Sequence, residues 1–290
     1  MTADGTKTVV NTSECSSSDV HVTDAFMYQI DLATVVAGAL PFKESNVNDT
    51  FRGLVLLGDG SQRPAILKDL NPRELANELI VSALAHQAGL PTPDSYLALA
   101  SPTALAAKKG PLLADGSRLI FASADVGIPN LTQRLTALNA NTVALLDDLA
   151  TWPDLGKLYA FDGWVANVDR HPGNLLHGGK SEFWLIDHGH CLTGPEWKPD
   201  SLDPNASVIS RLREWLTPVL TAQQKANRVN EAASFQAGLE ANVVASARRS
   251  CQIERTLPET DIDCAQNFLT ARADKISFYA NVALDCASLL

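Results

Sequence analysis

The feature that most constrains this chain is a polar segment at residues 167–174, NVDRHPGN, which lies between a helical pattern and a hairpin pattern. Pro172 and Gly173 favour a turn over a continued helix or strand. The carboxylate of Asp169 and the amide of Asn174 therefore belong to one loop. Such a loop can direct both groups toward the same point.

A hairpin is predicted directly after this loop. Residues 175–177 and 182–186 are short apolar runs on either side of a Gly-Gly pair. The second run ends at Asp187, which a His-Gly pair follows. The carboxylate of Asp187 and the amide oxygen of Asn174 are hard oxygen ligands that suit Mg²⁺. Asp169 is then left to act as a base or to orient a hydroxyl group.

The first third of the chain carries strand signals. Residues 53–57 and 65–67 are apolar runs around a Gly-Asp-Gly turn, which predicts another hairpin. Two further strands are predicted near 96–100 and 118–122. Together these segments predict a small, mostly antiparallel sheet.

A helix is predicted to begin at Pro72. Asn71 is a favourable N-cap, proline suits the first helical position, and a Gly-Leu-Pro sequence ends the helix. Glu78 lies on this helix, and Lys68 lies at the end of the strand before it. An ion pair between Lys68 and Glu78 would fix the direction in which Lys68 points.

The pattern changes to helical spacing after Pro129. We therefore expect a disordered tail over residues 1–24, a sheet-rich part over 25–125 and a mainly helical part over 126–290. Within the helical part, helices are predicted over 208–220 and 223–249.

Composition narrows the function classes. A chain of 290 residues with 46% hydrophobic content can bury a large core without disulfides or structural metals. Its five cysteines are scattered and odd in number, which is typical of reduced thiols. A net charge of -10 opposes direct nucleic-acid binding. No apolar stretch is long enough to span a membrane, and we expect a cytoplasmic protein.

The ordered set of motifs resembles the HipA-like and phosphatidylinositol 3-/4-kinase branch of the kinase superfamily. That branch has Asp-Arg-His-x-x-Asn in its catalytic loop and an Asp-x-Gly metal motif. Here the corresponding residues are Asp169-Arg170-His171-Pro172-Gly173-Asn174 and Asp187-His188-Gly189. The resemblance spans roughly residues 40–200 and is strongest to compact bacterial HipA-like kinases.

This resemblance implies an α+β, bilobed protein-kinase-like fold, with a small antiparallel-sheet N-lobe carrying one helix and a mainly helical C-lobe. ATP and Mg²⁺ are the implied cofactors. The implied catalytic residues are Asp169, His171, Asn174 and Asp187. Among them, Asn174 and Asp187 would bind the metal, and His171 would support charge in the transition state.

The resemblance also implies a nucleotide site. Lys68 would bind the phosphates and Glu78 would orient it. No Gly-x-Gly-x-x-Gly sequence is present, so the phosphate-covering loop is assigned to residues 38–45. Further candidate nucleotide contacts are Lys43, Ser45, Phe121, Ala122 and Ser123, the last three at an adenine-facing hinge over 121–125.

The implied activity is transfer of the γ-phosphate of ATP to a hydroxyl group, with Ser or Thr of a protein as the preferred acceptor. The loop order is Asp-Arg-His and no Ala-Pro-Glu follows the metal motif. Protein-kinase substrate rules therefore do not carry over, and a lipid or small-molecule acceptor stays open. An antitoxin or another regulatory partner would also fit the resemblance, but no residue identifies one.

Two readings of other classes stay open. A pseudokinase would bind nucleotide and regulate a partner without phosphate transfer. A zinc or iron site could instead use His171, His188 and His190 with Asp187, since imidazole and carboxylate are usual ligands of these metals.

Overall fold

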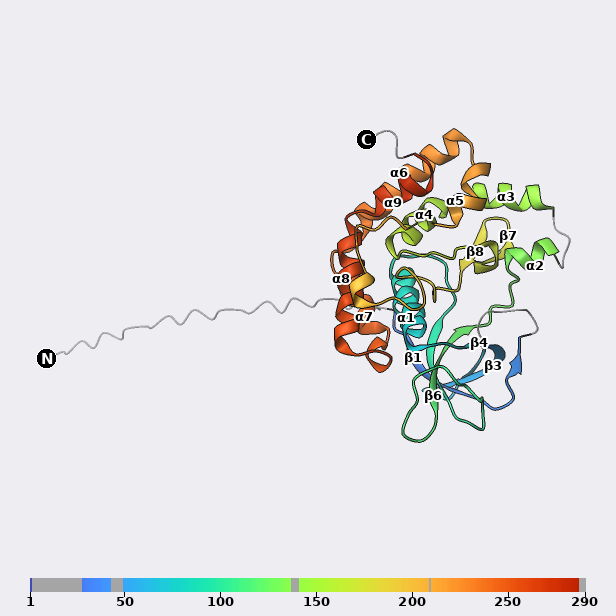
Figure 1. Cartoon of the computed structure of the whole chain (residues 1–290), viewed down its shortest axis with the longest axis vertical. Coiled ribbons are helices and arrows are strands. Elements are labelled where there is room, and N and C mark those ends of the chain that lie inside the picture. The colour runs from blue at the N-terminus through green and yellow to red at the C-terminus, as the bar shows by residue number, and fades with distance from the viewer. Residues whose placement is uncertain (2–27, 43–48, 137–140, 209, 287–290) are drawn as a thin grey trace.

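The computed structural model describes residues 1, 28–42, 49–136, 141–208 and 210–286. These residues form a mixed α+β structure. The strands β1, β3, β4 and β6 lie at one end and most helices at the other, with α1 (Pro72–Gln87) between them (Figure 1). The α+β prediction is therefore confirmed. The tail predicted over 1–24 lies outside the described residues, apart from Met1.

The described part of the chain contains one six-stranded sheet. Its strands are β1 (Asp31–Val35), β2 (Leu40–Pro41), β3 (Asp49–Leu57), β4 (Gln62–Asp69), β5 (Ser95–Ala100) and β6 (Arg118–Ala124). Their order is β1-β5-β6-β4-β3-β2, and β3 also pairs with β1, which closes the sheet into a small barrel. The sheet is antiparallel except for the β1–β5 pair, which is parallel. A mostly antiparallel sheet was expected, but the parallel pair was not identified, because an alternating pattern specifies the face of each side chain and not the direction of the neighbouring strand.

Alternation along the strands separates a barrel interior from an outer face. Ala98 and Ala122 point inward and belong to the core of the barrel, whose narrow interior favours small side chains. Their neighbours Leu97 and Phe121 belong to the larger core that includes α1. On β4, the same alternation places Lys68 on a face that lines a cavity.

Helix α1 begins as the sequence predicts. The side-chain oxygen of Asn71 accepts hydrogen bonds from the backbone N–H groups of Arg73 and Glu74, both at 3.0 Å. Gly89 follows the helix with φ +68°, a conformation that glycine adopts without strain. Most residues of α1 are buried, because the helix packs between the strands and α7 (Val243–Ser250).

Helices dominate the chain after residue 130. Their bounds are α2 (Leu131–Thr136), α3 (Thr142–Ala150), α4 (Leu155–Trp164), α5 (Leu212–Trp215), α6 (Ala222–Gly238), α7 (Val243–Ser250), α8 (Glu259–Ala273) and α9 (Ile276–Ala283). The predicted hairpin is present as β7 (Leu175–Gly179) and β8 (Glu182–Leu185). Helix α4 is almost wholly buried and packs against α6 and α9.

Two predicted helices are wrong in extent. The span 208–220 contains only α5 and one 3₁₀ turn, Thr217–Val219, because Pro218 cannot continue an α-helix. The span 223–249 is divided into α6 and α7. Helix α6 ends at Gly238, and Leu239 is extended, consistent with the low helix propensity of glycine.

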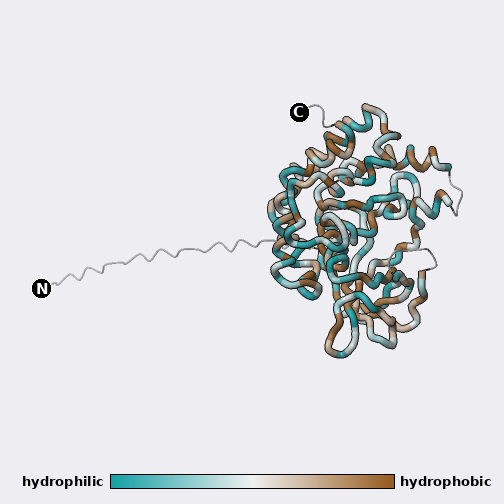
Figure 2. The backbone as a smooth tube through the Cα atoms, in the orientation of Figure 1, coloured by the Kyte–Doolittle hydropathy of each residue, from teal (hydrophilic) through white to brown (hydrophobic). Residues whose placement is uncertain are grey.

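Hydrophobic and hydrophilic residues alternate along most elements, as expected where one face is buried (Figure 2). Throughout the described ranges, every helix is too short or too polar to cross a lipid bilayer. The cysteines within these ranges, Cys191, Cys251, Cys264 and Cys286, are free thiols.

A buried arginine ties the helices together. Arg272 of α8 donates to the backbone oxygens of Gly163 (2.6 Å), Trp164 (2.9 Å) and Ala206 (3.1 Å). Its guanidinium lies 3.7 Å from the ring centroid of Tyr279. Burial lowers the pKa of Arg272 to about 10, so the side chain still carries its charge at neutral pH. Arg272 therefore fixes the end of α4 against the segment that contains residue 206.

We expect Arg272→Met to lower the free energy of unfolding by about 2–3 kcal/mol, because buried carbonyl oxygens lose their donors. Urea unfolding would measure the change. Arg255→Met, at an exposed arginine, is the control and should change stability by less than about 0.5 kcal/mol. Equal stability of the two variants would contradict the role given to Arg272.

Candidate functional site

A cavity of about 810 Å³ lies where β4, β6 and α1 meet the loop at 167–174 and the β7–β8 hairpin. It gathers most of the residues that the sequence singles out and that the structure describes. Those that line it are Lys68, Glu78, Phe121, Ser123, Asp169, His171, Asn174 and Asp187. Residues from distant parts of the sequence therefore line one partly open cavity, whose volume is in the usual range for small-molecule sites.

Lys68 connects two carboxylates inside this cavity. Its Nζ lies 2.7 Å from Oε1 of Glu78 and 3.0 Å from Oδ1 of Asp187. Burial acts to lower the pKa of Lys68, but the carboxylates of Asp187 and Glu78 raise it above its ordinary value. The ammonium of Lys68 is therefore positively charged, and its position is fixed by the carboxylates of Glu78 and Asp187.

The two carboxylates differ in their surroundings. Burial raises the pKa of Glu78. Burial would also raise that of Asp187, but the ammonium of Lys68 outweighs it and lowers the pKa of Asp187 to about 2. The Asp187 side chain is 45% exposed, so an ionised carboxylate faces the cavity. Such a group is suited to bind a cation.

Glu78 also reaches the backbone beyond Asp187. Its Oε2 accepts a hydrogen bond of 2.9 Å from the backbone N–H of His188. Asp187 itself has φ +64°, a left-handed conformation that aspartate tolerates better than most residues. Through Glu78, helix α1 thus contacts both Lys68 and the turn that contains Asp187.

The loop at 167–174 is closed by its own side chains. The backbone N–H of Asp169 donates to the side-chain oxygen of Asn167 at 2.9 Å. The Nδ2 of Asn174 donates to the backbone oxygen of Asp169 at 2.8 Å. Because Nδ2 is used in this way, the amide oxygen of Asn174 is the side-chain atom left to bind a cation. The backbones of Asn174 and Ile186 are also joined, by a hydrogen bond of 3.3 Å.

A buried ion pair supports this loop. Arg170 and Asp162 both have fully buried side chains, and Nε of Arg170 lies 3.0 Å from Oδ2 of Asp162. Arg170 also donates to the backbone oxygens of Asn174 (2.9 Å) and Ile186 (2.7 Å). Burial would lower the pKa of Arg170, but Asp162 raises it. Arg170 therefore fixes the positions of both proposed metal ligands without lining the cavity itself.

The carboxylate of Asp169 has three cationic or imidazole neighbours. Arg211 donates to its Oδ1 at 2.5 Å. The imidazoles of His171 and His190 lie 3.7 Å and 3.8 Å from its Oδ2. Arg211 was not predicted, because it follows Asp169 at long range in a segment with no recognisable motif.

The histidines do not form a metal cluster with Asp187. Within the described ranges, no group of three or more His, Cys, Asp or Glu residues is arranged to hold a metal ion. His188 is instead buried beside Arg170, with its Nδ1 3.5 Å from the guanidinium. Burial and Arg170 lower the pKa of His188 well below its ordinary value. The alternative of a zinc or iron site is therefore not supported.

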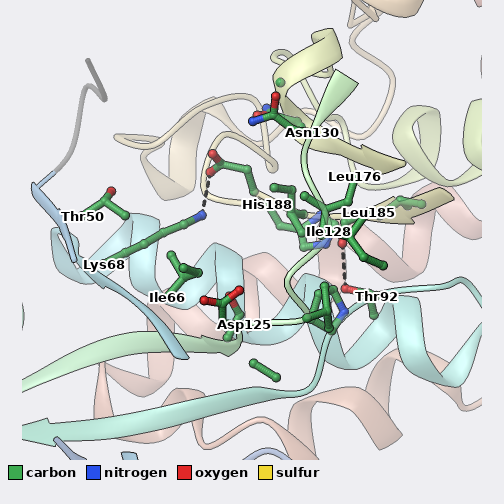
Figure 3. Close-up of a pocket in the computed structure, with 18 of the residues that line it drawn as sticks. Thr50, Ile66, Lys68, Thr92, Asp125, Ile128, Asn130, Leu176, Leu185 and His188 are labelled. Carbon is green, nitrogen blue, oxygen red and sulfur yellow. Dashed lines mark hydrogen bonds and ion pairs between the residues drawn. The ribbon is translucent and has the colours of Figure 1, made fainter. Parts of the chain in front are cut away.

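One end of the cavity is largely apolar. Figure 3 shows Thr92, Ile128, Leu176 and Leu185 gathered apart from Lys68, which extends into the cavity from β4. These residues were not predicted, since single apolar side chains carry no motif. We call this group of side chains the apolar slot.

The predicted hinge contributes unequally to this cavity. Phe121 and Ser123 line the cavity. Ala122 belongs to the core of the barrel, because alternate strand residues face opposite ways. Its side chain therefore does not line the cavity. Lys43 and Ser45 lie outside the described residues.

A family model described as HipA-like kinase matches residues 66–241, which is more than half of the chain. The matched span includes Lys68, Glu78, Asp169, Asn174 and Asp187. No curated protein matches the chain.

Proposed function

The chain belongs to the HipA-like kinase family, and from that premise we propose that it transfers the γ-phosphate of ATP to a hydroxyl group. Ser or Thr of a protein is the preferred acceptor. ATP would occupy the cavity between an N-lobe over residues 25–125 and a C-lobe over 126–290. Its base would lie in the apolar slot and its phosphates near Lys68.

The observation that carries this proposal is the convergence on Lys68. Its ammonium is bonded to Glu78 and Asp187 within the cavity that also contains Asp169 and Asn174. Phosphoryl transfer needs little covalent chemistry from a protein, but it needs fixed positive charge on the phosphates and an oriented acceptor. The cavity contains side chains suited to both tasks.

Each residue has a proposed task. Lys68 binds the phosphates, and Glu78 fixes the orientation of the Lys68 side chain. Asn174 and Asp187 would hold Mg²⁺, which neutralises phosphate charge when bound. Asp169 accepts a hydrogen bond from the acceptor hydroxyl and orients it for attack.

His171 has a supporting task in the proposal. Its Nε2 lies 3.7 Å from Oδ2 of Asp169. A donor at this place can stabilise charge that develops on the transferring group.

Replacing Asp187 with Ala is expected to abolish Mg²⁺-dependent ATP binding, because the ionised carboxylate that would hold the metal is removed. Calorimetric titration of ATP with and without Mg²⁺ would measure this. Asp200→Ala, at an exposed aspartate outside the cavity, should bind as the native chain does.

Two results would count against the proposal. Binding of ATP that is equally strong with and without Mg²⁺, in both the native chain and Asp187→Ala, would favour a nucleotide-binding regulatory module. Absence of ATP binding by the native chain would remove the nucleotide site itself.

A further inference from the structure

We propose that Arg211 is a positioning residue for phosphate transfer, whose guanidinium holds one oxygen of Asp169 so that the other faces the acceptor hydroxyl. The inference rests on the proposed function, because it concerns the orientation of the same carboxylate. No motif in the sequence points to Arg211, and it acts from a segment far along the chain.

The position of Arg211 is set by the fold. Its neighbours Ser210 and Leu212 are buried, with exposed fractions of 5% and 0%. Trp215, at the end of α5, donates its indole N–H to the backbone oxygen of Arg170 at 2.9 Å. The turn that carries Arg211 is therefore attached directly to the loop that carries Asp169.

The backbone and the carboxylate of Asp169 are held by different groups. Asn167 and Asn174 bond to its backbone and leave the side chain free to rotate. In the described part of the chain, the carboxylate itself accepts one hydrogen bond, the 2.5 Å contact from Arg211. The two imidazoles near Oδ2 are beyond hydrogen-bonding distance, at 3.7 Å and 3.8 Å.

A charge-assisted bond of this length favours the orientation of the carboxylate in which Oδ1 faces Arg211. With Oδ1 occupied, Oδ2 of Asp169 is the oxygen available to a hydroxyl group. A catalytic carboxylate commonly needs a further group that orients it. Arg211 is suited to that task, because its ion pair with the exposed Glu214 is long, with 4.0 Å between Nε and Oε2.

Phosphoryl transfer depends mainly on positioning and electrostatic stabilisation, because its transition state is loose and leaves little covalent chemistry for the protein. Orientation of the hydroxyl contributes more than basicity. A misplacement of about 1 Å can reduce a rate by about 100-fold.

The opposite role is a block, in which Arg211 occupies the place of the acceptor. The two roles predict changes of opposite sign. Removal of a positioning group lowers turnover, whereas removal of a block raises it.

The test is steady-state MgATP hydrolysis, with water as the acceptor, by the full chain and by Arg211→Gln, Arg211→Lys, Arg213→Gln and Asp169→Asn. We expect Arg211→Gln to lower kcat by about 10–100-fold with an unchanged KM for ATP. Arg211→Lys should recover part of the loss, because it restores the charge but not the planar fork. Arg213, two positions away, pairs with Asp285 at the surface and serves as the matched control.

The outcomes separate the two ideas. Unchanged or faster hydrolysis by Arg211→Gln, alongside inactive Asp169→Asn, would overturn the positioning role and leave the proposed function intact. A native chain without turnover, or an Asp169→Asn variant as fast as the native chain, would overturn the proposed function and this inference with it. A raised KM for ATP with normal kcat would also overturn positioning. Thermal unfolding of each variant checks that the fold is retained.

Discussion

Asp169→Asn is expected to reduce phosphate transfer by about 10²–10⁴-fold, the usual contribution of a positioned acid–base group, while MgATP binding persists. The substitution keeps the size of the side chain and removes its charge. Lys68, Asn174 and Asp187, the proposed ligands of the nucleotide and the metal, remain in place. Transfer of ³²P from ATP, together with calorimetric ATP binding, would separate the two effects.

Asp59→Asn is the control for this experiment. Asp59 lies in the exposed turn between β3 and β4, where it accepts a hydrogen bond from Ser61. It does not line the cavity. Transfer by this variant should equal that of the native chain, and equal transfer by Asp169→Asn would refute the catalytic role.

Asp162→Ala is expected to lower the free energy of unfolding by about 3–5 kcal/mol, because Arg170 would remain buried without its counterion. Asp162 also accepts a hydrogen bond of 3.1 Å from Asn167, which would be lost as well. Urea unfolding followed by circular dichroism would measure the change. The loop at 167–174 should also become less ordered, since Arg170 donates hydrogen bonds that support it.

A surface ion pair on the same helix provides the comparison. Asp154 and Lys157 are 2.7 Å apart, and both side chains are partly exposed. Asp154→Ala should change stability by less than about 1 kcal/mol. A loss of similar size in Asp162→Ala would show that Arg170 finds another partner.

Local signals made much of the fold predictable. The start of α1 follows from Asn71 and Pro72, and the β7–β8 hairpin follows from short apolar runs around glycines. The expected pair of Lys68 and Glu78 is present, because a strand end and the following helix leave little choice of direction. These features depend on residues close together in the sequence.

Long-range features were not predictable in the same way. The parallel pairing of β1 with β5 depends on strands whose patterns carry no direction. The contacts of Asp169 with Arg211 and of Arg170 with Asp162 join charged residues that have no characteristic spacing. Ala122 was grouped with Phe121 and Ser123, although strand alternation turns it into the barrel.

Glu78 has a consequence for how the cavity could be switched. Its Oε1 accepts a hydrogen bond from Nζ of Lys68, and its Oε2 accepts one from the backbone N–H of His188. The two halves of the cavity therefore cannot be assembled separately. A small rotation of α1 would release Lys68 and the turn at Asp187 in the same movement. Since α7 packs against α1, a movement of α7 that rotates α1 would disrupt the proposed phosphate and metal sites together.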